Sequence, residues 1–174
     1  DFFTNRLDRT PTTISSWVDV DVSADIPSGA VGVIVAIAPT AAGSGGIRMN
    51  GSIDTFTYSN ILGSKQIFQV AGVDANRIFE AQINATTSKI WLVGYFMAPI
   101  SFETNAISYA LTATAAWTDI TVSAGAAPAD ADGALWLVYN SSAGTTYTGG
   151  VRKNGSTDAS YAKIRQAGII ALFS

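Results

Sequence analysis

Two copies of one nine-residue stretch decide the fold of this chain: Gly46-Ile47-Arg48-Met49-Asn50-Gly51-Ser52-Ile53-Asp54 and Gly150-Val151-Arg152-Lys153-Asn154-Gly155-Ser156-Thr157-Asp158. Six of the nine positions are identical. Gly29-Ala30 precedes the first copy by the same 17 residues that separate Gly133-Ala134 from the second. The chain therefore carries an internal duplication, and we expect each copy to form one structural unit.

An Asn-Gly pair stands at the centre of both copies, between short segments of strand-forming residues. Asn-Gly is the preferred pair of a two-residue type I′ hairpin, because both central residues of that turn need positive φ. We therefore predict hairpin turns at Asn50 and Gly51 and at Asn154 and Gly155.

The duplication continues to the N-terminus at an offset of 100 residues, since the loop that ends at Gly133 is four residues longer than the loop that ends at Gly29. Phe2, Thr4, Asn5 and Trp17 recur as Phe102, Thr104, Asn105 and Trp117. At the later offset of 104, Ser174 corresponds to Val70, unless an internal deletion makes 168–173 the last strand. We predict module 1 over residues 1–100 and a shortened module 2 over residues 101–174.

The strand pattern is clear in both copies. Residues 17–22 and 117–122 alternate apolar and polar side chains, which predicts a half-buried strand. The apolar run at 31–38, matched by 135–139, is typical of a central strand covered on both faces. With the further segments 67–70, 77–83 and 89–96, this predicts an all-β protein of two tandem antiparallel β-sandwich modules, jelly-roll-like, the second shortened.

Composition limits the partners. Only 13% of residues are charged, against about a quarter in typical domains, while 48% are hydrophobic. With so few charged residues, much of the surface must be uncharged, and such a surface is common where proteins pack against copies of themselves. The net charge of -3 and the ten scattered basic residues argue against nucleic acid, and no apolar run approaches the roughly 20 residues that span a membrane.

The chain contains neither cysteine nor histidine, which removes thiolate metal sites and the commonest general base. Asp19 and Asp21 would lie about 7 Å apart on one strand face, a spacing that suits glycosidic acid-base pairs. Copy two has Thr121 in place of Asp21, so a solvated sheet surface is the better interpretation. A calcium site remains as an alternative without EF-hand spacing; its ligands would be Asp25, Asp130 and Asp132. We predict no enzymatic activity and no cofactor.

The aromatic residues leave two interpretations open. They could form a platform on which sugars stack, or they could be packing pairs, as the recurrence of Trp17 and Trp117 at one module position suggests. The residues concerned are Trp17, Trp91, Trp117, Trp136, Tyr58, Tyr95, Tyr139 and Tyr147.

Two sets of residues are candidate interface residues. Arg48 and Arg152 recur beside the Asn-Gly pair, either as local salt bridges with Asp54 and Asp158 or as subunit contacts, where arginine is enriched. A shortened module 2 would also leave a sheet edge and core side chains uncovered. We expect strands from a neighbour, either copy one of the same chain or an adjacent subunit, to fill that edge. The exposed core side chains would be Ile120, Leu135 and Leu137.

One resemblance to a known family adds to this. The duplicated Gly-Ile/Val-Arg-x-Asn-Gly-Ser-x-Asp stretch, together with residues 73–81 and 90–95, resembles small β-rich repeats of virion structural proteins of tailed bacteriophages. The resemblance covers most of copy one and the front half of copy two. It implies a capsid-decorating, head-fibre or tail-associated role in a homo-oligomer with other virion proteins, and no catalytic residues. The alternative is a carbohydrate-binding adhesion module or an extracellular filament subunit.

Overall fold

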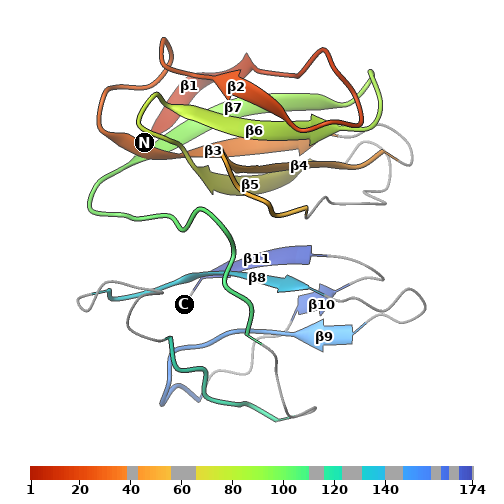
Figure 1. The fold of residues 1–174 in the computed structure, drawn as a ribbon. Coiled ribbons are helices and arrows are strands. Elements are labelled where there is room, and N and C mark those ends of the chain that lie inside the picture. The colour runs from red at the N-terminus through yellow and green to blue at the C-terminus, as the bar shows by residue number, and fades with distance from the viewer. Residues whose placement is uncertain are drawn as a thin grey trace. The chain divides into compact units, whose positions relative to one another are not determined.

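A computed structural model shows the fold of the chain (Figure 1). It describes residues 1–38, 43–55, 66–109, 116–122, 131–139, 147–157, 162–164 and 169–173. These residues belong to two compact units, Asp1–Ala106 and Ile107–Ser174. They form strands, turns and loops and no helix, so the predicted all-β class is confirmed for the described part of the chain. The first unit ends at Ala106 rather than at residue 100.

Unit 1 is a sandwich of two antiparallel sheets (Figure 1). The larger sheet has the order β1-β7-β3-β5, and the smaller sheet has the order β2-β6-β4. The strands of the larger sheet are Phe2–Asp8, Lys89–Met97, Ala30–Ala38 and Ile67–Gly72. Those of the smaller sheet are Val18–Asp21, Ile78–Ile83 and Gly45–Met49.

Both sheets contribute alternate residues to one core. In β6, Phe79, Ala81 and Ile83 are fully buried, while Glu80 and Gln82 between them are half-buried on the opposite face. Strand β3 lies between β7 and β5, as predicted for a central strand, and its residues 33, 35 and 37 belong to the same core. Each large side chain buried there stabilises the fold by roughly 1.5–3 kcal/mol, so the core holds the two sheets together.

Unit 2 contains two antiparallel strand pairs in its described residues. Strand β8 (Leu135–Tyr139) pairs with β11 (Ile169–Phe173), and β9 (Tyr147–Gly149) pairs with β10 (Ala162–Ile164). The step from the end of β8 to the start of β11, 139 to 169, closely matches the step from β3 to β5, 38 to 67. Both β5 and β7 pair antiparallel with β3, so the pairing of β11 with β8 fits either alignment of the second copy.

The predicted strand over residues 117–122 is wrong, because none of these described residues is in a strand. Its counterpart β2 is held by antiparallel pairing with β6. Among the residues that the structure describes, no strand pairs with residues 117–122. An alternating pattern of apolar and polar residues does not by itself form a strand when no second strand pairs with it.

The two duplicated turns form, but not as type I′ hairpins. Gly51 and Gly155 have φ of 77° and 82°, whereas neither preceding Asn has positive φ. The Ser52 N–H donates to the Met49 carbonyl over 3.1 Å, and the corresponding bond in copy two measures 3.0 Å. One positive φ at the third turn position is typical of a type II turn. In copy one the described residues after the turn, 52–55, form no strand, and β4 pairs with β6.

Valine at Gly51 or Gly155 should lower the free energy of unfolding by roughly 1–2 kcal/mol, because a β-branched residue is strained at positive φ. A Cβ at either position meets no atom within 4 Å, so backbone strain is the sole cost. Urea unfolding measures the loss, and Gly51→Asn is the control, since Asn tolerates this conformation better. An unchanged unfolding midpoint in both valine variants would show that these turns do not require positive φ.

Candidate functional site

The duplicated arginine stacks on the duplicated tryptophan in both units. The guanidinium carbon of Arg48 lies 4.4 Å from the ring centroid of Trp17, and that of Arg152 lies 4.2 Å from the centroid of Trp117. Arginine above an indole face is attracted by the electrons of the ring. The two residues that recur in the sequence therefore form one recurring cation-π pair.

In unit 1 the arginine of this pair, Arg48, also binds a residue of the neighbouring strand in the smaller sheet. Arg48 donates to Glu80 from Nε over 2.7 Å and from Nη2 over 3.1 Å, and from Nη1 to the Asp54 carbonyl oxygen over 2.6 Å. Arg48 and Glu80 are register partners on β4 and β6. The predicted carboxylate partner Asp54 is thus wrong, because its backbone oxygen rather than its side chain is bound. Sequence reasoning missed Glu80, since 32 residues separate the pair; Asp158 lies outside the described residues.

The other two tryptophans are also packed. The Arg6 guanidinium carbon lies 3.6 Å from the Trp91 centroid, and the rings of Tyr109 and Trp136 meet edge to face at 5.7 Å. All four tryptophans thus have a cationic or aromatic partner, which favours the packing interpretation over a sugar platform. Tyr95 packs against Phe3 at 5.8 Å. Tyr58, and the side chains of Tyr139 and Tyr147, lie outside the described residues.

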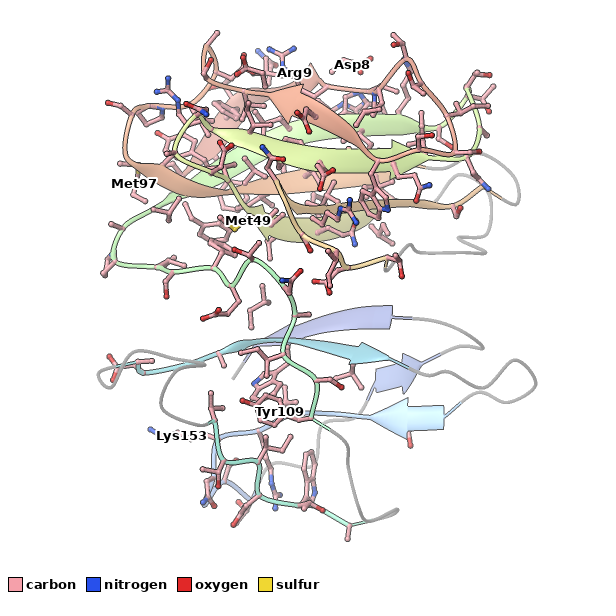
Figure 2. The ribbon with its side chains drawn as sticks, in the orientation of Figure 1. Asp8, Arg9, Met49, Met97, Tyr109 and Lys153 are labelled. Atoms are coloured by element: carbon pink, nitrogen blue, oxygen red, sulfur yellow. The ribbon has the colours of Figure 1, made fainter. Side chains whose placement is uncertain are left out.

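The carboxylate pair predicted on β2 borders an open groove of about 400 Å³, lined by residues 8–13 and 18–21. Asp8 and Arg9 mark this rim of unit 1 in Figure 2. Asp21 Oδ1 accepts the Ser23 N–H over 2.8 Å, and this bond lowers the pKa of Asp21. A carboxyl with a lowered pKa is ionised at neutral pH and is a poor general acid. The geometry thus supports the solvated-surface interpretation of Asp19 and Asp21.

The calcium alternative gains no support from the described residues. The Asp25 carboxylate is held by the Arg9 guanidinium. Asp130 lies outside the described residues, and the residues that are described contain no cluster of three acidic side chains fit for a metal ion. No helix in the same part of the chain is long and apolar enough to cross a membrane.

Asp74 organises the turn between β5 and β6. Its Oδ1 accepts the N–H groups of Asn76 and Ile78, each over 2.9 Å, and its Oδ2 accepts from the Asn50 side chain over 2.9 Å. Burial raises the pKa of Asp74, but these hydrogen bonds outweigh it and the pKa lies below its ordinary value. The same turn holds Arg77 at a φ of 63°. Asp74 thereby ties this turn to the duplicated Asn-Gly turn.

Replacing Asp74 with Asn should cost roughly 1–2 kcal/mol at pH 7, because the Asn50 amide would then face a second amide donor. Since the folded pKa is depressed, the carboxylate stabilises the fold above the unfolded pKa of about 3.9 and loses this effect as the pH falls through the folded value. The difference in unfolding free energy between wild type and the variant should therefore become smaller below about pH 4. Urea unfolding at pH 7 and pH 3 measures it, and a gap independent of pH would contradict the assigned bonds.

Residues 102–106, which we name the strap, open the second repeat in sequence but pack on unit 1. The Phe102 ring lies over two glycines that are register partners on β3 and β5, Gly32 and Gly72. A Cβ at Gly72 would lie 2.6 Å from Phe102 Cβ, and one at Gly32 would lie 2.6 Å from its Cζ. Phe96 flanks the ring at 5.7 Å between centroids. Met49, labelled in Figure 2, borders the same socket, with its sulfur 3.0 Å from a Cβ placed on Gly72.

Polar contacts fix the other end of the strap. Asn105 Oδ1 accepts from the Ser52 hydroxyl over 3.2 Å and from the Ile53 N–H over 2.9 Å. The Ala106 N–H donates to the Asp54 carboxylate over 2.7 Å. The strap is thus held at two points. The Phe102 ring packs into the socket formed at Gly32 and Gly72, and hydrogen bonds join Asn105 and Ala106 to the residues that follow the duplicated turn.

The predicted interface residues are divided between the two units, with Arg48 in unit 1 and the others in unit 2. Arg48 and Arg152 are used in the tryptophan stacks. Ile120 is half-buried and Leu135 is exposed on β8. Leu137 lies on β8, but its side chain is outside the described residues.

No family model, no curated protein and no solved structure matches this chain.

Proposed function

We propose that the chain is a non-enzymatic structural protein of a virion, made of two tandem jelly-roll-like modules, which acts through contacts with copies of itself and with other assembly proteins. The virion setting, as a capsid-decorating, head-fibre or tail-associated protein, rests on the sequence resemblance. The assembly role is supported chiefly by one feature of unit 1, an uncharged strand at a sheet edge.

That strand is β5, the last strand of the larger sheet among those that the structure describes. Its six residues carry no charge, and the Phe68 side chain is 61% exposed. Natural proteins usually protect a sheet edge with charge, proline or a bulge, because an open edge pairs with other chains. An edge without charge suits addition of a strand from another protein.

The outer face of this sheet is apolar beside the same edge. Ala36 pairs with Phe68 and Ile34 pairs with Val70 in the β3–β5 register. Since the alternate residues of β3 point into the core, these four side chains lie on the opposite face. Of the four, Phe68 is exposed, Ile34 and Val70 are half-buried and Ala36 is buried. The uncharged edge and the exposed Phe68 beside it together form a surface suited to a second copy.

Light scattering after size-exclusion chromatography tests the assembly role. We expect the mass of the full chain to rise with concentration above the 18.1 kDa of one copy. Phe68→Lys should lower that association, because it places a charge at the edge. Ile14→Lys is the control, since Ile14 is also exposed but lies outside the larger sheet.

A mass of one copy at every concentration would contradict self-assembly. A single copy that shifts only when polysaccharide is added would favour the carbohydrate-binding alternative.

A further inference from the structure

The strap can leave unit 1 without opening its core. Every residue of the core cluster lies between Val20 and Leu92, and none belongs to residues 102–106. Phe102 covers the outer face of the larger sheet, on the same side as Ile34 and Ala36, rather than its core face. The strap forms no strand, and the connector before it, residues 97–101, is exposed throughout. Releasing the strap therefore breaks its own contacts and leaves the sandwich intact.

The duplication identifies the strap as the counterpart of residues 2–6. Phe2, Thr4 and Asn5 of the first repeat are identical to Phe102, Thr104 and Asn105 of the second. In the first repeat this segment lies in β1, which pairs with β7 of its own unit. In the second repeat the same segment lies on the unit that precedes it. The same sequence element thus packs on its own unit in the first repeat and on the preceding unit in the second repeat.

We propose that the strap is exchangeable, so that the socket at Gly32 and Gly72 of one copy receives the strap of a second copy. This inference rests on the proposed assembly role and specifies its contact. The contacts are the same within one chain and between chains, and exchange of an identical element is a low-cost route to oligomers. Because each copy offers both a strap and a socket, two copies can exchange straps reciprocally, or a series of copies can be linked head to tail.

Within a single chain the attached strap competes with any second copy. A short tether gives an effective concentration in the millimolar range, so the intramolecular contact dominates in dilute solution. Exchange should become visible when the protein is concentrated, as in an assembly, or when one copy lacks its own strap contacts.

Two full-length variants separate strap from socket. The acceptor, Phe102→Ala with Asn105→Ala, keeps the socket but lacks the strap side chains. The donor, Gly72→Val, keeps the strap but fills the socket, since the three atoms nearest to a Cβ there belong to Phe102 and the flexible Met49. Tagged acceptor should capture at least ten times more donor than wild type. Adding Gly72→Val to the acceptor should abolish the difference.

A labelled synthetic peptide of residues 101–107 gives an independent readout. We expect it to bind the acceptor at least tenfold more tightly than it binds wild type, and not to bind the acceptor that also carries Gly72→Val. Equal binding to all three, or no binding to an acceptor with native circular dichroism, would overturn the proposal. If the acceptor does not fold, the peptide is added to wild type at millimolar concentration. Loss of hydrogen-exchange protection at Ala106 alone then supports exchange, and unchanged protection overturns it.

These results distinguish the strap from the assembly role. Self-association in light scattering without any peptide binding would remove the strap exchange and leave the assembly role standing. Peptide binding to the acceptor by a chain that is a single copy at every concentration would show that the socket accepts a separate strap, but would remove both the assembly role and exchange between whole copies.

Discussion

Replacing Phe102 with alanine should lower the free energy of unfolding of unit 1 by about 2–3 kcal/mol. A fully buried Phe→Ala change costs about 3–5 kcal/mol, and the Phe102 ring is half-buried. The ring fills a socket that only glycines at positions 32 and 72 leave open, so its removal uncovers two strands at once. Urea unfolding followed by tryptophan fluorescence measures the loss.

Phe2→Ala is the matched control, because Phe2 holds the same position in the first repeat and its side chain is 76% exposed. We expect it to change the unfolding free energy by about 0.5 kcal/mol or less. Equal losses from the two substitutions would contradict the different roles assigned to the two copies of this segment.

Replacing Arg48 with alanine should cost about 2–4 kcal/mol. The change removes both hydrogen bonds to Glu80, the bond to the Asp54 carbonyl and the stack on Trp17. The side chains of Arg48 and Glu80 are only 15% and 14% exposed, so the carboxylate left behind is poorly solvated. Breaking one side of a buried pair costs about 3–5 kcal/mol, and partial exposure places this pair at or below that range.

Lys89→Ala is the control for the arginine variant. Lys89 pairs with Asp8 over 3.1 Å, but the two side chains are 46% and 51% exposed. Such surface pairs contribute about 0–1 kcal/mol, so the expected loss is small. A loss from Lys89→Ala as large as that from Arg48→Ala would show that burial does not set the strength of these pairs.

Local patterns in the sequence predict the strands well. Alternation and apolar runs placed β3, β6 and β7 within a residue or so of their observed bounds, and residues 135–139 are those of β8. Periodicity carries this information because each strand is half buried or fully buried by its own neighbours. The same pattern at 117–122 was misleading, since pairing depends on a partner strand that local sequence does not report.

The candidate site was less predictable because its contacts join distant residues. An Asn-Gly pair suits both type I′ and type II turns, so the turn type was decided by the pairing of β4 with β6. The Arg48–Glu80 pair follows only from that register. The strap was assigned to module 2 by repeat alignment, which identifies related segments but not the unit on which each packs. The signal that was available is the pair of glycines at 32 and 72 within two predominantly apolar strands.

Amide hydrogen exchange of the full-length protein tests most directly whether the second repeat gives its first residues to unit 1. Two amides report on the strap, because the Ile53 N–H donates to Asn105 and the Ala106 N–H donates to Asp54. We expect both to be protected in wild type, and both to lose protection together in Phe102→Ala while the β6 amides keep theirs. Exchange of Ile53 and Ala106 at unprotected rates in wild type would contradict the docked strap.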